Sequence, residues 1–336
     1  MKIVCALLLF AVALPAAAGR VWTFEGRRYY DPLIAGVRDA HVSALALASA
    51  TRMDFMIEND SPRRVWDIDV GAELPIIGWE QTGTGDRMAE GNFGYGVWLL
   101  VDFHMIEDFV DESAPIVNTD YRFGGMLKAQ YGLSSNRWIS ARLHVGHEST
   151  HLGDEFSIRG QRKYRATFER VNVSWEYLDL GLLYESQPDS KVVSSWSVRA
   201  GVTSTLPFHD AYYQVGPGSI TESPQPVTLS RNWFDPYAGI EAEKSKAYKL
   251  FGKAWAVYAS GEVRWRSRYD YHKLNPDASE ERQASVNLIV GTQVSGSGGL
   301  GRASPFIRFY RGINPHGQFR NQKNYTEYGI GVRLMR

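Results

Sequence analysis

The stretch that decides the fold is residues 91–108, GNFGYGVWLLVDFHMIED. Every second residue from Phe93 to Met105 is apolar, and the residues between them are small, polar or mixed. Alternation with a period of two is typical of a β-strand whose two faces meet different surroundings. An unbroken apolar face opposite a mixed face is the pattern of a membrane barrel strand, apolar outward and polar inward.

The same alternation recurs along the rest of the chain, in residues 178–185, 196–203, 255–266, 284–293 and 327–334. Charged residues such as Arg199, Glu262 and Arg264 lie on the faces opposite the apolar ones. A charge is costly to bury alone, and a polar barrel interior supplies water and partners. Trp255 and Trp265 would lie about 25 Å apart in height on one face, close to the spacing of the aromatic girdles of a membrane barrel.

We therefore predict an all-β fold, a single antiparallel transmembrane β-barrel of about 12 strands. The barrel domain is expected to span residues 19–336, with an irregular N-terminal arm over residues 20–40. Residues 43–53 suit either a strand or a helical turn, and residues 206–232 leave open whether they contain a strand. A soluble β-sandwich is the alternative fold, but it would have to solvate the charged faces while packing the others.

The first 18 residues have the pattern of a secretory signal peptide. Lys2 precedes an apolar run over residues 3–14, which is followed by Pro15 and three alanines that end at Ala18. The run is shorter than the roughly 20 residues that a membrane-spanning helix needs. We expect cleavage after Ala18, which removes the single cysteine, and export to the outer membrane, where the barrel-assembly machinery would fold the chain.

A net charge of zero gives no basic footprint for nucleic acid, and the oligomeric state stays open.

The candidate for catalysis lies in residues 136–156, NRWISARLHVGHESTHLGDEF. His147 and Ser149 are two residues apart on a strand and therefore point the same way, as a base and a nucleophile require. We expect Glu169 on the next strand, or alternatively Asp154, to orient His147. This expectation puts Trp175 on the lipid-facing side of that next strand, in line with Glu169.

Two other interpretations of the same residues stay open. His147, Ser149 and His151 could be polar residues at the membrane interface. Alternatively, a metal site could be formed by His151, Asp154 and Glu155, with or without His147. Alternating histidines can chelate a divalent ion and the carboxylates suit Ca²⁺. No zinc motif of standard spacing is present.

Two further segments have a structural interpretation beside a functional one. Residues 314–319, NPHGQF, are typical of a turn, with a catalytic histidine at His316 as the alternative. Arg264, Arg266 and Arg268 form a ladder on the inner face. The ladder predicts either a charge-paired interior, with Glu262 and Asp270 as partners, or an anion-selective lining.

The pair His147–Ser149 resembles the His-x-Ser of two families of outer-membrane lipid hydrolases, phospholipase A1 and the lipid A 3-O-deacylase. The resemblance implies a serine-type lipid esterase acting on membrane lipids or lipopolysaccharide. The phospholipase pattern continues with Asn-Gly after the serine, whereas this chain has Thr150-His151.

A broader resemblance spans most of the mature chain. The segments DPLIAGVRDAH, RVWDIDVGAELPI, HESTHLGDEF and YRGINPHGQF are similar to a bacterial family catalogued as domain of unknown function twelve-oh-seven. This resemblance implies an outer-membrane barrel and supplies no activity. Three functions are thus open: a structural or transport barrel, a lipid acyl hydrolase, and a soluble periplasmic β-protein that binds a ligand.

Overall fold

The computed structural model describes residues 19–24, 29–31, 34–36, 39, 42–49, 64–81, 87–108, 116–153, 170–206, 211–214, 225–227, 234–267, 282–294, 302–320 and 322–335. Over these residues the chain forms fifteen strands in one connected arrangement and a single turn of 3₁₀ helix, η1 (Gly317–Phe319). Within the same residues, no helix is long and apolar enough to cross a membrane.

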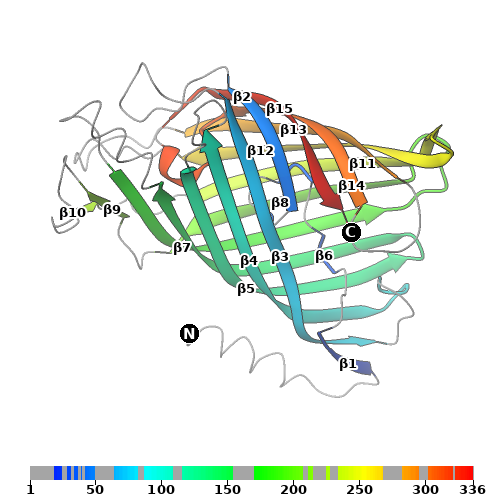
Figure 1. Cartoon of the computed structure of the whole chain (residues 1–336). Helices are drawn as coiled ribbons and strands as arrows, with labels where there is room; N and C mark the ends of the chain where they lie inside the picture. The colour runs from blue at the N-terminus through cyan, green and yellow to red at the C-terminus, as the bar shows by residue number, and fades with distance from the viewer. Residues whose placement is uncertain are drawn as a thin grey trace.

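Twelve of the described strands close into an antiparallel ring (Figure 1), which confirms the predicted barrel and its strand number. The ring strands are β2 (Val42–Ser49), β3 (Arg64–Gln81), β4 (Phe93–Asp108), β5 (Ile116–Ser134), β6 (Arg137–Leu152), β7 (Arg170–Ser186), β8 (Ser195–Thr205), β11 (Phe234–Leu250), β12 (Lys253–Ser267), β13 (Arg282–Val294), β14 (Arg302–Gly312) and β15 (Tyr325–Met335). Each pairs with its neighbour in this order, and β15 pairs back with β2 over Ser43–Ser49.

Three short strands lie off the ring. β1 (Gly19–Thr23) pairs with the last residues of β3, so the predicted irregular arm begins with a strand. β9 (Ala211–Gln214) and β10 (Gln225–Val227) extend β7 beyond the end of β8. The sequence left residues 43–53 and 206–232 open. The first segment contributes the ring strand β2, and the second contains β9 and β10, which lie outside the ring. Residues 1–18, 154–169, 268–281 and 295–301 lie outside the described residues, so the signal peptide stays a prediction.

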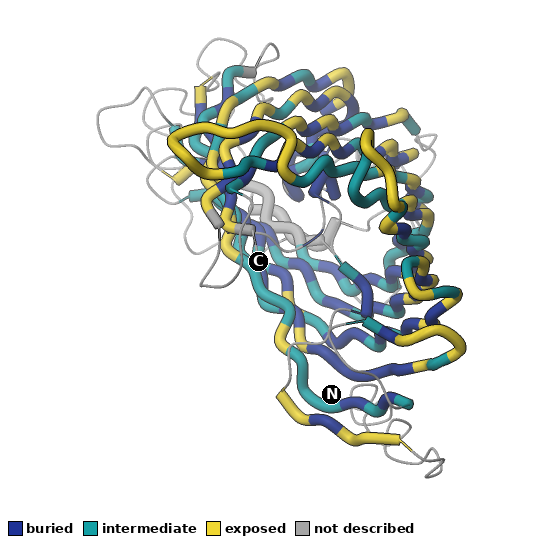
Figure 2. The backbone as a smooth tube through the Cα atoms, turned by 90° about the vertical axis from the view of Figure 1, so that its right-hand side faces the viewer, coloured by how far each residue is buried: buried dark blue, intermediate teal, exposed yellow. Residues whose placement is uncertain are grey.

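The two faces of the ring are inverted relative to a soluble protein. Every ring strand exposes a large apolar side chain on its outer face: Val42, Val70, Leu99, Phe123, Ile139, Leu180, Val198, Ile240, Val263, Leu288, Ile307 and Ile330. The inner face instead buries charged residues, among them Arg122, Arg199, Glu262 and Arg266. Figure 2 shows the resulting alternation of exposed and buried residues around the ring. An apolar belt this extended is far larger than the patches that soluble proteins leave in water, so the belt suits lipid.

The two ends of the barrel differ in the length of their connections. At one end, which we term the turn end, residues 135–136 join β5 to β6 and residues 251–252 join β11 to β12. At the opposite end, the loop end, β6 joins β7 through residues 153–169 and β8 joins β11 through residues 206–233. Membrane barrels have short periplasmic turns and longer extracellular loops. The strand β1 pairs with β3 at the turn end, so the described chain starts there.

Candidate functional site

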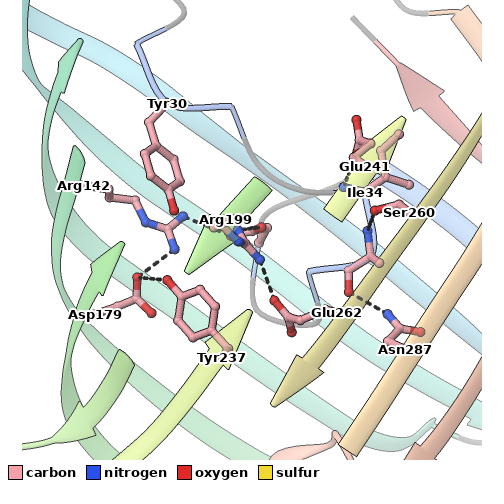
Figure 3. Close-up of polar contacts among 12 residues, drawn as sticks. Tyr30, Ile34, Arg142, Asp179, Arg199, Tyr237, Glu241, Ser260, Glu262 and Asn287 are labelled. Carbon is pink, nitrogen blue, oxygen red and sulfur yellow. Dashed lines mark hydrogen bonds and ion pairs between the residues drawn. The ribbon is translucent and has the colours of Figure 1, made fainter. Parts of the chain in front are cut away.

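The described residues of the N-terminal arm that follow β1, which are 29–31, 34–36 and 39, contact the inner face of the barrel. Asp39 of this arm lies between two wall arginines, as its Oδ1 is 3.0 Å from Nη1 of Arg142 on β6 and its Oδ2 accepts a hydrogen bond from Arg199 on β8. Arg142 Nη2 is 2.7 Å from Oδ1 of Asp179, and Arg199 Nη2 is 2.5 Å from Oε2 of Glu262 (Figure 3). All five side chains are buried, so the arm supplies one charge of a continuous buried ion-pair network, which we term the arm network.

The backbone of the arm is hydrogen-bonded by side chains from several strands of the wall. Ile34 N donates to Glu241 Oε2 on β11 at 2.8 Å, and Ala35 N donates to Ser260 Oγ on β12 at 3.0 Å. Ala35 O accepts from Asn287 Nδ2 on β13, and Ile34 O accepts from Arg333 Nη1 on β15, both at 2.8 Å. Buried backbone groups need such partners, and here the barrel wall takes the place of a neighbouring strand.

Aromatic rings separate the charges of the arm network. The guanidinium of Arg142 lies 4.7 Å from the ring centroid of Tyr30, which belongs to the arm. Arg199 and Arg264 lie 5.0 and 4.3 Å from the ring centroid of Tyr237 on β11, whose hydroxyl donates to Asp179 Oδ1 at 3.1 Å. Burial raises the pKa of Tyr30, so its hydroxyl is neutral at physiological pH. The arginines are thus held by cation–π contacts as well as by carboxylates.

A second segment enters the barrel from the loop end. Residues 313–320, which we term the inner loop, follow β14 and carry η1. His316 N donates to Asn314 Oδ1 at 3.1 Å, as expected of the predicted turn. Arg320 bonds to Asp235 on β11 and donates from Nε to Ser267 O at 2.8 Å. The inner loop therefore contacts the wall far from β14, and its side chains His316 and Arg320 are fully buried.

His316 meets two polar residues of the opposite wall. One ligand atom from each of His316, His104 on β4 and Asp120 on β5 lies within 4.8 Å of the others. The two imidazole centroids are 4.8 Å apart, and Asp120 is the direct register partner of His104. Asp67 on β3 accepts from His104 Nε2 at 2.5 Å. Burial, together with the nearby His104, holds the pKa of His316 well below its usual range, so this imidazole is neutral at physiological pH.

The predicted catalytic residues lie on the outer face of β6, near the loop end. Ser149 Oγ is 2.8 Å from Nε2 of His151 rather than of His147. His147 instead faces β7, where Ser174 Oγ lies 3.5 Å from its Nε2 and Glu176 Oε1 lies 3.3 Å from its Nδ1. The catalytic pairing of Ser149 with His147 stays a prediction.

The face assigned to the strand after His147 was wrong. Trp175 lies on the inner face of β7 and is 1% exposed, because its neighbour in register is the inward-facing Glu148. The direct register partner of His147 is Glu176, on the outer face. Glu169, the expected orienting residue, lies outside the described residues, as do Asp154 and Glu155, which were expected to orient His147 or to bind a metal.

In the arginine ladder, Arg264 pairs with a carboxylate, as in the charge-paired interpretation, whereas Arg266 contacts the hydroxyl of Tyr310 and the backbone of Ile313. Arg264 and Arg266 are buried on the inner face. Arg264 Nε is 3.3 Å from Glu262 Oε1, its predicted partner, and Arg266 Nη1 is 3.3 Å from Tyr310 Oη. Arg268 and Asp270 lie outside the described residues.

Sequence reasoning missed the residues that carry both interior clusters. Asp39 lies in an arm without periodicity, and His104 lies on a strand face that was described only as mixed. The one available signal was the coincidence of Asp67, Asp102, His104 and Asp120 on inner faces, where an isolated charge would be costly.

The chain resembles solved barrel structures at low sequence identity. The translocator domain of the autotransporter NalP from Neisseria meningitidis is 12% identical, with a TM-score of 0.38, and covers 89% of this chain and 90% of that chain. The match to the β-domain of the Bordetella autotransporter BrkA has 11% sequence identity and a TM-score of 0.37. It covers 89% of this chain and 100% of that chain. The match to a FadL homologue from Pseudomonas aeruginosa has 10% sequence identity and a TM-score of 0.34. It covers 88% of this chain and 90% of that chain. A comparison with curated proteins finds no significant match.

Residues 14–198 match the family described as "Protein of unknown function (DUF1207)". The match includes the arm, the strands β1 to β7 and the first residues of β8, and therefore more than half of the sequence. Three of the four segments that resembled this family, those within residues 31–156, fall inside the matched range. The chain belongs to the DUF1207 family.

Proposed function

We propose that this protein is an outer-membrane barrel that provides a passage for anionic solutes, closed at rest by its own N-terminal arm. The observation that carries the proposal is the position of Asp39 between Arg142 and Arg199. The apolar outer face of the barrel supports the location, and the short connections at the turn end favour a periplasmic origin for the arm.

The argument for a passage rests on size and charge. About eight strands give a barrel just wide enough to be filled by its own side chains. A ring of twelve strands is wider, and here two chain segments occupy its interior. With the arm in place, Arg142, Arg199 and Arg264 face Asp39, Asp179 and Glu262. If the arm leaves, one of the three carboxylates leaves with it, and the wall gains a net positive charge that attracts anions.

Conductance in planar lipid bilayers tests this proposal. The wild-type barrel should conduct little. Asp39→Asn should raise conductance and make it anion-selective, as read from the reversal potential in a salt gradient. A disulfide between Ala35→Cys and Asn287→Cys, whose native residues share a 2.8 Å hydrogen bond, should hold conductance low until it is reduced. Equal conductance in all three proteins, or cation selectivity in Asp39→Asn, would contradict the proposed passage.

The location has its own test, because a soluble periplasmic protein was the alternative. The exported protein should sediment with the outer membrane, resist extraction by urea, and migrate faster on gels before heating than after. Recovery in the aqueous periplasmic fraction would rule out the barrel as a membrane protein and with it both functions proposed here.

A lipid acyl hydrolase is the second candidate function, and the outer face of β6 and β7 favours it. Ser174 Oγ, His147 and Glu176 are in the order of a nucleophile, a base and an orienting acid, with contacts of 3.5 and 3.3 Å. Such contacts are often loose before substrate binds. Ser149 with His151 is the other nucleophile–base pair on this face. In either case the serine oxygen would attack a lipid ester carbonyl, and the histidine would take its proton and pass it to the leaving alcohol.

Acyl release from a fluorogenic phospholipid and from lipopolysaccharide separates the two pairs. If Ser174 is the nucleophile, Ser174→Ala and His147→Ala should each lower the rate by several orders of magnitude, while Ser149→Ala and His151→Ala retain it. The opposite pattern would identify the Ser149–His151 pair. If all four variants release acyl chains at the wild-type rate, or if the wild type releases none, the hydrolase candidate is wrong.

A further inference from the structure

The starting observation is a buried histidine with no hydrogen-bond partner on its ring. His316 is 0% exposed, and within the described residues neither its Nδ1 nor its Nε2 has a partner. A buried polar group without a partner costs free energy, and a native structure that retains one calls for an explanation such as a bound ion.

The groups around His316 form a set of metal ligands. His104, Asp120 and His316 offer two nitrogens and a carboxylate oxygen within 4.8 Å of one another. Asp120 and His316 are buried, and the side chain of His104 is 11% exposed. Two ligands of a tetrahedral ion with metal–ligand distances of about 2.0–2.1 Å are about 3.4 Å apart. The three ligand atoms, now up to 4.8 Å apart, would therefore have to approach one another by about 1.4 Å to enter one coordination sphere.

Neighbouring side chains and a backbone amide already hydrogen-bond to two of the three ligands, His104 and Asp120. Asp67 Oδ1 lies 2.5 Å from His104 Nε2 and fixes the orientation of this ring, and Arg308 Nη1 holds Asp67 Oδ2 at 2.9 Å. Asp120 accepts from Asn118 Nδ2 at 2.9 Å and from Gly317 N at 3.0 Å. A carboxylate behind a ligating histidine is the usual arrangement in metal sites, where it sets the tautomer and the basicity of the ring.

We propose that His104, Asp120 and His316 bind a divalent transition-metal ion that ties the inner loop to the barrel wall. The nitrogen donors favour Zn²⁺, Fe²⁺ or a similar ion over Ca²⁺, which takes oxygen ligands. Two ligands come from β4 and β5 and the third from the inner loop, so the ion joins segments that are about 200 residues apart in the chain. This site is distinct from the predicted one at His151, which lies on the outer face beside Ser149.

Metal binding by the purified full-length chain in detergent tests the proposal. A chelator first strips the protein, Zn²⁺ is then added back, and dialysis removes the excess. The wild type should then hold about one Zn²⁺ per chain, and Co²⁺ added in its place should give the visible absorption of a low-symmetry site. His316→Gln and Asp120→Asn should each weaken Zn²⁺ binding at least tenfold. His144→Gln is the matched control, since His144 is also buried on an inner face but contacts Tyr177. Heat-modifiable gel mobility reports whether each variant folds.

The wild type alone keeps the test decisive if the variants fail to fold. X-ray absorption of the Zn²⁺-loaded wild type should show scattering from two imidazoles. A wild type that binds no Zn²⁺, Co²⁺, Fe²⁺ or Mn²⁺ at stoichiometric levels overturns the proposal. So does all-oxygen coordination, or Zn²⁺ affinity that is unchanged in folded His316→Gln.

Discussion

At the scale of single residues, the interior of this barrel is organised by pairs of charges. Arg142, Arg199 and Arg264 would each be costly to bury alone, and each contacts a carboxylate or a tyrosine ring. Removing one member of a buried ion pair lowers the free energy of unfolding by more than the pair contributes, because the remaining charge stays buried without compensation. Asp39 contacts two of these arginines, and it is the member of the network that the arm contributes.

Asp39→Asn should release the arm from the wall. The loss of this carboxylate leaves Arg142 and Arg199 with one acidic partner each, and we expect a cost to arm docking of about 3–5 kcal/mol. Limited proteolysis from the turn end should then cleave the arm in the variant but not in the wild type. Asp31→Asn is the control: Asp31 also pairs with Arg87, at 2.7 Å, but its side chain is 37% exposed, and an exposed ion pair contributes only about 0–1 kcal/mol. An arm equally resistant in both proteins would show that Asp39 does not hold it.

A charge on the outer belt should be tolerated only near the ends of the barrel. Leu180 lies on the outer face of β7, opposite Leu143 in the middle of β6 and 45% exposed. Leu180→Arg should destabilise the folded barrel in lipid by about 2–4 kcal/mol, whereas Leu334→Arg, close to the end of β15, should cost about 0–1 kcal/mol. Reversible denaturant unfolding in vesicles measures both. Equal costs would argue that the exposed belt does not face a bilayer.

At the scale of elements, the arm and the inner loop enter the interior from opposite ends. The inner loop approaches the wall so closely that Gly317 has no room for a side chain. A Cβ on this residue would lie 2.7 Å from Thr150 Cγ2 and 3.0 Å from Asp120 Oδ1. The absence of a side chain is what lets Gly317 N donate to Asp120.

Gly317→Ala should loosen the inner loop without opening the ring. The added methyl group forces either Thr150 or the loop to move, at a cost of about 1–3 kcal/mol. Thermal unfolding should shift downward, and amide exchange should rise across residues 313–320. Gly261→Ala is the matched control, because its Cβ would meet only the end of Leu288, at 3.1 Å. No difference between the two variants would mean that the loop is not closely packed on Asp120.

The strands could be predicted from the sequence, and most of the interior could not. Period-two alternation depends on neighbours two residues apart, so it gave the barrel, its strand number and the outward position of His147 and Ser149. Contacts such as Asp39 with Arg199, or His104 with His316, depend on how the ring closes and leave no local pattern. The histidine partner of Ser149 could not be chosen from the sequence, since His147 and His151 are equally distant along the strand and only side-chain conformation separates them. The face of Trp175 was misassigned because an apolar residue near a barrel end can pack inward.

At the scale of the whole molecule, the apolar surface faces outward and the charges face inward. Figure 1 shows the strands that form the closed ring. The interior is filled by elements from the two ends of the chain, so stability in this barrel depends on segments outside the ring as well as on the ring itself.

Removal of the metal should therefore lower the thermal stability of the whole barrel. A ligand that binds only the folded state, at 100 times its dissociation constant, adds about 2.7 kcal/mol of stability. A chelator should lower the unfolding temperature of the wild type, and Zn²⁺ should restore it. His316→Gln should unfold at the same temperature with and without chelator. A wild type that is insensitive to the chelator would contradict this coupling.

The pairing of β15 with β2 has a consequence for the order of assembly. The arm immediately precedes β2 in the chain, and β2 with β15 forms the last seam of the ring, joining its first strand to its last. Strands that hold the arm backbone, β11, β12, β13 and β15, are synthesised long after the arm itself. We therefore expect the arm to be enclosed as the seam forms rather than threaded into a finished barrel, with its contacts helping to bring the two ends of the sheet together. The arm residues that contact the wall would then act first as a folding template.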